Sequence, residues 1–109
     1  MKAGQPKKDW HLCLYVAGPN AESTAALRNL KQICEAHLAG RYLIEVIDLM
    51  KNPRLAREDQ IVAVPAVVRK RPLPPRKIIG DLSNTERALA GLDLRAKPNL
   101  SGISPEELD

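Results

Sequence analysis

The first half of the chain alternates between the apolar periods of strands and of a helix. In WHLCLYVA, residues 10–17, every second side chain is aliphatic, and a period of two predicts a β-strand. After the loop GPNAES, apolar residues recur at helical spacing from Glu22 or Ser23 to Leu38. The segment YLIEVIDL, residues 42–49, predicts a second strand. A strand–helix–strand unit of this length makes the two strands parallel.

The second half places prolines beside its apolar runs. KNPRLAREDQ, residues 51–60, predicts a short helix capped by Asn52. IVAV at 61–64 and KII at 77–79 predict the two strands of a hairpin, although Pro65 and three further prolines lie between them. Proline removes a backbone donor and is usually excluded from strands. This segment therefore carries two conflicting signals.

A last helix is predicted over residues 83–94. Ser83 and Glu86 have the spacing of a capping box, which satisfies two free backbone donors at a helix start. The resulting order is β-α-β-α-β-β-α, a parallel unit followed by an antiparallel hairpin and a helix. The predicted fold class is therefore α/β (α+β) with a thioredoxin-like arrangement.

The composition indicates one small domain with an aliphatic core. The chain has 109 residues, of which 44% are apolar and only 3% aromatic. We expect a disordered basic N-terminus over residues 1–9, one domain over 10–94 and a mobile tail over 95–109. No apolar run reaches the roughly 18 to 20 residues of a membrane span, and no signal peptide is recognised. We therefore expect a cytoplasmic protein without a membrane contact.

The net charge of +4 favours acidic partners only weakly. Five basic residues gather around the prolines: Arg69, Lys70, Arg71, Arg76 and Lys77. Nucleic-acid binding would need stacking aromatics or a recognised motif, and the sequence offers neither. We therefore expect no nucleic-acid partner and favour a contact surface for an acidic protein.

Neither cysteine lies where a thiol enzyme needs it. Cys13 lies inside a predicted strand and Cys34 late in a helix, whereas thioredoxin-like enzymes place the nucleophile in the loop before that helix. The cysteines form no CxxC motif and no zinc-like spacing, and no phosphate-binding or dinucleotide motif occurs. We therefore expect buried or half-buried free cysteines, no catalytic residue, no cofactor and no metal.

Several long motifs follow one another in an order that is specific for one family. They are LCLYVAG (12–18), VIDLMKNPRLAREDQI (46–61), AVP (63–65), PPRKIIGDLSNTE (74–86) and GLDL (91–94). Over about residues 12–94 the chain resembles the KaiB family of circadian clock proteins. The resemblance implies a non-enzymatic regulator that binds KaiC, a hexameric RecA-like ATPase and kinase, and modulates its phosphorylation state or signalling output.

The resemblance also implies two folds. The resting form is a homotetramer, in equilibrium with dimer and monomer, in which the C-terminal half differs. The form that binds KaiC is a thioredoxin-like monomer, and the predicted element order is that of this form. In cyanobacteria the bound form captures KaiA and displaces a sensor kinase with a thioredoxin-like domain.

We expect Pro65, Gly91 and Asp93 to act in fold switching and Arg69, Arg76 and Lys77 to contact a partner. The resemblance implies that Gly91 and Asp93 match family positions that bias the switch and that the three basic residues lie near family binding positions. Pro65 occupies the place where thioredoxin-like folds typically carry a cis-proline. We expect Val64–Pro65 to be cis in the thioredoxin-like form and trans in the other. Gly91 would weaken the last helix by about 1 kcal/mol relative to alanine.

Three positions depart from the family pattern. Cys13 and Glu45 stand where members commonly carry lysine, and Ala25 where arginine is usual. Glu45 reverses a charge on the surface tied to KaiA and the sensor kinase, which places capture of these two partners in doubt. The alternative function is a thioredoxin-like signalling or stress-response module that no longer binds KaiC. A thiol enzyme is the third class, and the missing loop cysteine opposes it.

Overall fold

The structure, a computed structural model, describes residues 9–94 and has seven elements in the predicted order. They are β1 (Trp10–Val16), α1 (Ala21–Leu38), β2 (Tyr42–Asp48), α2 (Leu55–Glu58), β3 (Ala66–Arg71), β4 (Arg76–Ile79) and α3 (Thr85–Leu92). The predictions for residues 1–8 and 95–109 lie outside the described part. Within residues 9–94, no helix is both long and apolar enough to cross a bilayer.

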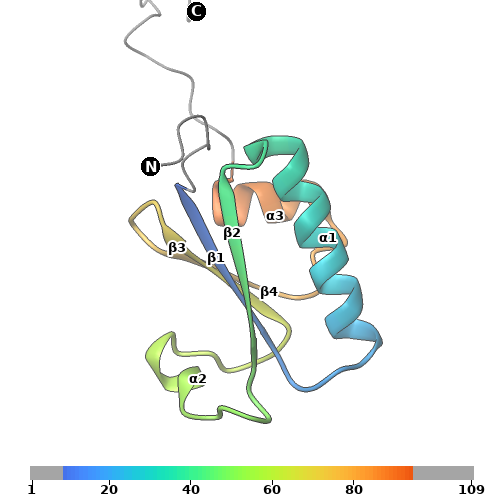
Figure 1. The fold of residues 1–109 in the computed structure, drawn as a ribbon, viewed down its shortest axis with the longest axis vertical. Helices are drawn as coiled ribbons and strands as arrows, with labels where there is room; N and C mark the ends of the chain where they lie inside the picture. Colours follow the sequence, from blue (N-terminus) through green and yellow to red (C-terminus); the bar gives the residue numbers. More distant parts are fainter. Residues whose placement is uncertain (1–8, 95–109) are drawn as a thin grey trace, which may run out of the picture.

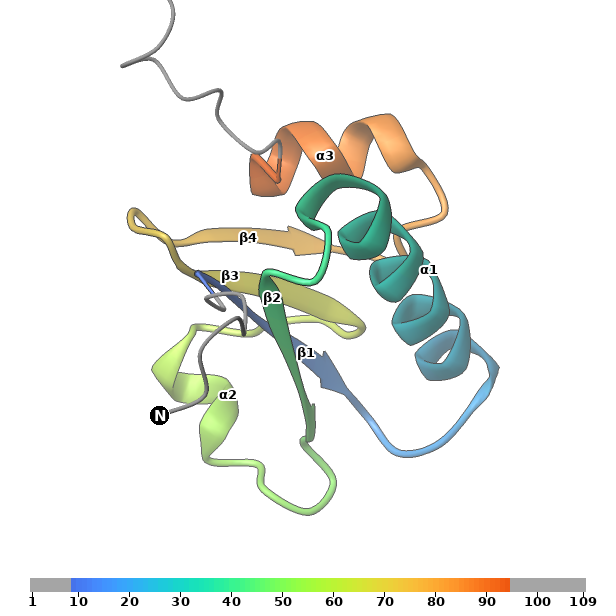
Figure 2. The same cartoon turned by 45° about the horizontal axis from the view of Figure 1, so that its top comes forward.

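The four strands form one sheet in the order β2-β1-β3-β4 (Figure 1). β1 pairs with β2 in parallel, as the strand–helix–strand unit predicts, and both β1–β3 and β3–β4 are antiparallel. Helices α1 and α3 cover one face of the sheet, and the short α2 lies on the other face (Figure 2). The predicted thioredoxin-like arrangement is confirmed.

β1 lies inside the sheet and is buried on both faces. Its Leu12 and Leu14 join the larger core beneath α1 and α3, together with Leu92. Its alternate residues, including Tyr15, join a smaller core that Leu55 of α2 partly covers. Strands covered on both faces tolerate few charges, so the polar groups on β1 and β3 need specific partners.

The first strand of the predicted hairpin is wrong in position. Residues 61–64 form no strand, and Val62 is 85% exposed. The strand begins instead at Ala66, because Pro65 has no N–H for the ladder, and it continues into basic residues assigned to the turn. The carbonyl of Pro65 accepts a hydrogen bond from the backbone N–H of Gly80, 2.8 Å away.

Two predicted helix caps are also wrong by one or two residues. α2 begins after Arg54 rather than Asn52, and it spans only four residues. The cap of α3 is Asn84, whose side chain accepts a backbone N–H in the first turn. Ser83 does not cap this helix; its own N–H donates to Asp81 Oδ1 at 3.0 Å.

Candidate partner-binding surface

Arg69, one of the predicted contact residues, is buried at the centre of β3 with only 3% of its surface exposed. Its Nη1 donates to the carbonyl of Asp93 at 3.1 Å, and Nη2 donates to the carbonyl of Pro74 at 2.6 Å. The guanidinium also lies 5.6 Å from the ring centroid of Trp10, within cation–π range. A buried cation needs such partners. In this conformation Arg69 therefore joins β1, the hairpin turn and α3, and does not present itself to a partner.

A hollow of about 370 Å³ opens beside these contacts, and we call it the hairpin hollow. It is lined by the proline turn, by Trp10, by three arginines (Arg41, Arg69 and Arg76) and by two aspartates (Asp9 and Asp93). Arg76 is exposed at the rim, and Leu73 at the tip of the turn is 73% exposed. The exposed apolar side chain of Leu73 and the exposed guanidinium of Arg76 would suit a partner segment that carries both apolar and acidic side chains.

The three predicted contact residues do not form one surface. Arg76 is paired with Arg69 in the β3–β4 register and adjoins the hairpin hollow. Lys77 projects from the opposite face, where its Nζ donates to the backbone carbonyls of Asp59 and Gln60 at 3.2 and 2.7 Å. The structure thus brings Arg69 and Arg76 together and leaves Lys77 at the end of α2.

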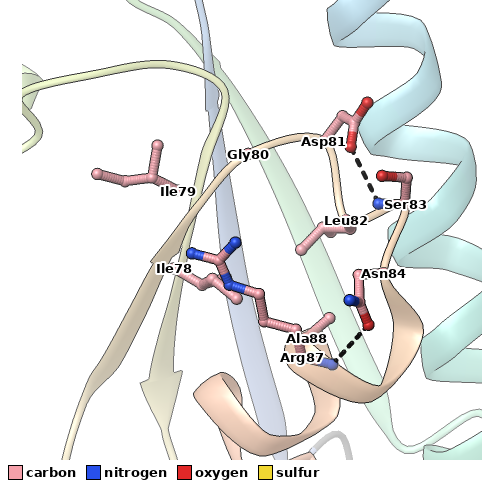
Figure 3. A pocket seen from close by; sticks show the side chains of 9 residues that line it. All are labelled: Ile78, Ile79, Gly80, Asp81, Leu82, Ser83, Asn84, Arg87 and Ala88. Atoms are coloured by element: carbon pink, nitrogen blue, oxygen red, sulfur yellow. Dashed lines mark hydrogen bonds between the residues drawn. The ribbon is translucent and has the colours of Figure 1, made fainter.

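The loop from β4 to α3 lines a second, smaller pocket of about 70 Å³ (Figure 3). Hydrogen bonds from Ser83 hold the carboxylate of Asp81 and lower its pKa below the usual range. The side chain of Asn29 on α1 donates to the backbone carbonyl of Asp81 at 2.8 Å. Figure 3 shows the side chain of Arg87 extending from α3 toward Ile78 on β4. The hydrogen bonds of Asp81 to Ser83 and Asn29 connect the loop to α1, so we interpret this loop as a structural link between α1, β4 and α3.

The three predicted switching residues lie near the two ends of the C-terminal half: Pro65 directly before β3, and Gly91 and Asp93 at the end of α3. The Val64–Pro65 peptide bond is cis, the isomer expected for this form. Gly91 allows α3 to approach β4 closely, since a Cβ there would lie 3.0 Å from Cδ1 of Ile78. Asp93 ends α3 in the left-handed region, with φ of 49°, and offers its carbonyl to Arg69.

The thiol groups lack the environment of a nucleophile. Cys13 and Cys34 are free and buried, as predicted. Burial raises the pKa of Cys13 to about 11 and that of Cys34 to about 12. Thiols with such values are protonated near neutral pH, whereas reactive cysteines have lowered pKa values.

Sequence reasoning missed three polar contacts that depend on how the strands pair. Trp10 lies beneath Arg69, and the carboxylate of Asp59 accepts the hydroxyl of Tyr15 and lies 3.2 Å from the ammonium of Lys70. The period of two gives the face of each strand, but the partner on that face depends on the register. No signal in the local sequence could have identified these partners.

Comparison with known proteins gives one family. The model of the KaiB domain matches residues 13–94. The circadian clock oscillator protein KaiB of Synechococcus elongatus is 52% identical over 89 residues, which cover 82% of this chain and 87% of that protein. The KaiB protein of Acaryochloris marina is 50% identical over 97 residues, covering 89% and 93% of the two chains.

Solved structures with the same fold are more distant in sequence. The N-terminal domain of Synechococcus elongatus SasA matches with a TM-score of 0.64 at 22% identity, over 90% of this chain and 93% of that one. Mitochondrial thioredoxin 3 of Saccharomyces cerevisiae matches with a TM-score of 0.62 at 20% identity, over 78% and 77% of the chains. At these identities the likeness concerns the fold alone.

Proposed function

The chain belongs to the KaiB family of circadian clock proteins, and from this premise we propose that it binds a KaiC-like ATPase hexamer and modulates its phosphorylation or signalling output. The observation that carries the proposal is the combination of about 50% identity over the domain with a thioredoxin-like conformation. In the family this conformation is the one that engages KaiC.

We place the contact at the hairpin hollow. Arg76 supplies an exposed charge, and Leu73 supplies an apolar side chain that stands clear of the domain. Arg69 is buried and would support the contact indirectly, because its hydrogen bonds hold the turn and the end of α3 in place around this hollow. Lys77, on the other face, would support the contact only through the end of α2.

The C-terminal half is also the proposed site of a fold switch to a tetrameric resting form. Pro65 lies at the boundary between the halves, and Gly91 and Asp93 join α3 to the sheet. Losing the contacts of these residues would weaken the attachment of α3 to the sheet, while β4 would keep its pairing with β3. Two folds of one chain interconvert when they differ by only a few kcal/mol.

Competition with a thioredoxin-like sensor kinase is a further part of the proposal, supported by the fold shared with the SasA domain. Glu45 opposes both this competition and the capture of KaiA, because its side chain is exposed and acidic on the edge strand β2. Cytoplasmic location stays a prediction.

Co-elution with a KaiC-like hexamer in size-exclusion chromatography tests the proposal. We expect the wild-type chain to co-elute and Arg76→Glu to weaken the affinity at least about tenfold, the size of a central interface contact. Arg28→Glu on α1 is the matched control, since Arg28 is an exposed arginine remote from the hairpin hollow. Failure of the wild type to bind any KaiC-like hexamer would leave the signalling-module alternative.

A further inference from the structure

Three side chains with metal-ligand atoms converge on the α2 face of the sheet, where β1 and β2 pair. His11 and Cys13 are two residues apart on β1, so they point to the same face. Glu45 on β2 lies directly opposite Cys13 in the parallel register. Within residues 9–94, this is the only group of three such side chains whose ligand atoms all lie within 4.8 Å of one another.

The distances between the ligand atoms are close to those of a tetrahedral metal site. Nε2 of His11 lies 3.1 Å from Oε1 of Glu45 and 3.8 Å from Sγ of Cys13, and Sγ lies 3.6 Å from Oε1. Zinc bonds of about 2.0 to 2.3 Å at tetrahedral angles place such N, O and S atoms roughly 3.3 to 3.6 Å apart. The three distances join the same three atoms, so Nε2, Sγ and Oε1 form one closed triangle of potential ligand atoms.

We propose that His11, Cys13 and Glu45 form a site for Zn²⁺ or a similar transition metal, with the fourth coordination position open to solvent. Imidazole and thiolate ligands favour zinc over the hard cations Mg²⁺ and Ca²⁺. A site with three protein ligands and one open position is the arrangement that zinc enzymes use, as opposed to closed structural sites. The metal would clamp the edge strand β2 to β1.

Access and charge balance fit this assignment. Cys13 is buried, but the side chains of His11 and Glu45 are 28% and 56% exposed, so an ion reaches the site from solvent. Binding replaces the S–H proton, which Cys13 donates to Glu45, and releases it to water. Thiolate and carboxylate then balance the two charges of the ion. The nearby ammonium of Lys70 is paired with Asp59 at 3.2 Å, which limits its repulsion.

The competing interpretation is an ordinary polar cluster, in which His11 and Glu45 form an ion pair and Cys13 donates a weak hydrogen bond. The two interpretations differ in one observable, a metal–sulfur bond. The chain has only two cysteines and two histidines. Any thiolate–metal signal must therefore come from Cys13 or from Cys34, which lies in the core on the opposite face of the sheet.

Titration of the untagged, reduced, chelator-treated full chain with Co²⁺ tests the proposal. We expect one ion per chain, a thiolate-to-Co²⁺ charge-transfer absorption in the near ultraviolet, and loss of this absorption when Zn²⁺ is added. Cys13→Ser should abolish the absorption, and the matched control Cys34→Ser should keep it. Absence of the absorption in the wild type, or its persistence in Cys13→Ser, overturns the proposal.

A second variant keeps the test valid if Cys13→Ser fails to fold. Glu45 is exposed, so Glu45→Gln preserves the shape of the sheet and removes only the charged ligand. We expect Glu45→Gln to lower the Zn²⁺ affinity by at least about tenfold. The control Glu22→Gln, at an exposed position of α1, should leave the affinity unchanged. Equal affinities for wild type and Glu45→Gln would exclude the carboxylate as a ligand and overturn the three-residue site.

Discussion

Replacing Gly91 by alanine probes how closely α3 packs against β4. A Cβ on Gly91 would lie 3.0 Å from Cδ1 of Ile78, and the next atoms of the same side chain are 3.6 and 3.7 Å away. Ordinary carbon–carbon contacts are about 3.5 to 4.0 Å, so Cδ1 must move by some tenths of an ångström. That atom is the free end of a half-buried side chain, which makes the movement inexpensive.

Two terms of similar size oppose each other in this variant. Alanine is favoured over glycine by about 1 kcal/mol inside a helix, and somewhat less near an end. Crowding a packed contact costs typically about 1 to 3 kcal/mol, and the free end of Ile78 places this case at the low limit. We therefore expect Gly91→Ala alone to change the free energy of unfolding by less than about 1 kcal/mol.

The variant Ile78→Val removes Cδ1 and with it the crowding. In that background the nearest remaining atom is Cγ1, at 3.6 Å from the added Cβ, which is ordinary contact. Gly91→Ala should now stabilise the protein by up to about 1 kcal/mol. The coupling energy between the two positions should be on the order of 1 kcal/mol, whereas independent sites add within about 0.5 kcal/mol.

Urea unfolding of the wild type, both single variants and the double variant measures this coupling. Light scattering on the same samples is needed, because oligomer equilibria shift the apparent stability. Additivity of the two changes would refute the packing argument. If Gly91 also biases the proposed fold switch, the monomer fraction should rise in the double variant; unchanged populations in all four proteins would contradict that role.

Three further predictions concern buried polar groups. Arg69→Met should destabilise the fold by about 1 to 3 kcal/mol, because the carbonyls of Pro74 and Asp93 lose their donor. Urea unfolding measures this change, and a loss of stability below about 0.5 kcal/mol, the size of an ordinary surface substitution, would refute the prediction. Tyr15→Phe should cost about 1 to 3 kcal/mol, because Asp59 loses a buried donor, and an unchanged urea midpoint would count against that hydrogen bond. Burial raises the pKa of Cys34 from 9.0 to about 12, so the folded state keeps a proton that the unfolded state releases. Stability from this group is complete below pH 9 and falls as the pH rises toward 12, and Cys34→Ala should show a shallower loss over this range.

The local pattern of apolar residues was sufficient to predict the N-terminal strand–helix–strand unit, but it was insufficient to predict the position of β3. The strand β1 and the helix α1 follow periods that the sequence displays directly, and their parallel return to β2 follows from the length of the connection. β3 carries Arg69 in its middle, which local reasoning assigned to a solvated turn. The burial of that charge depends on Asp93 and Trp10, which are distant in sequence. The register between β1 and β2 likewise determines that Glu45 meets Cys13, and no local pattern specifies it.

The same long-range contacts bear on the proposed fold switch of the C-terminal half. β1 and β2 share seven paired positions, and the larger core beside them is formed with both α1 and α3. β4, in contrast, has four residues. The region of α3 is held by the burial of Ala88, Leu92 and Leu94 in the larger core, by one hydrogen bond from Arg69, by the close approach at Gly91 and by the hydrogen bond from Asn29. Each hydrogen bond contributes about 0.5 to 3 kcal/mol and each fully buried leucine about 1.5 to 3 kcal/mol, so the buried apolar side chains are a large part of what holds α3 to the sheet. A partner that binds the hairpin hollow contacts the turn that Arg69 holds in place. Such a partner would bind more tightly when α3 is attached to the sheet than when it is released, and it would therefore favour the attached state.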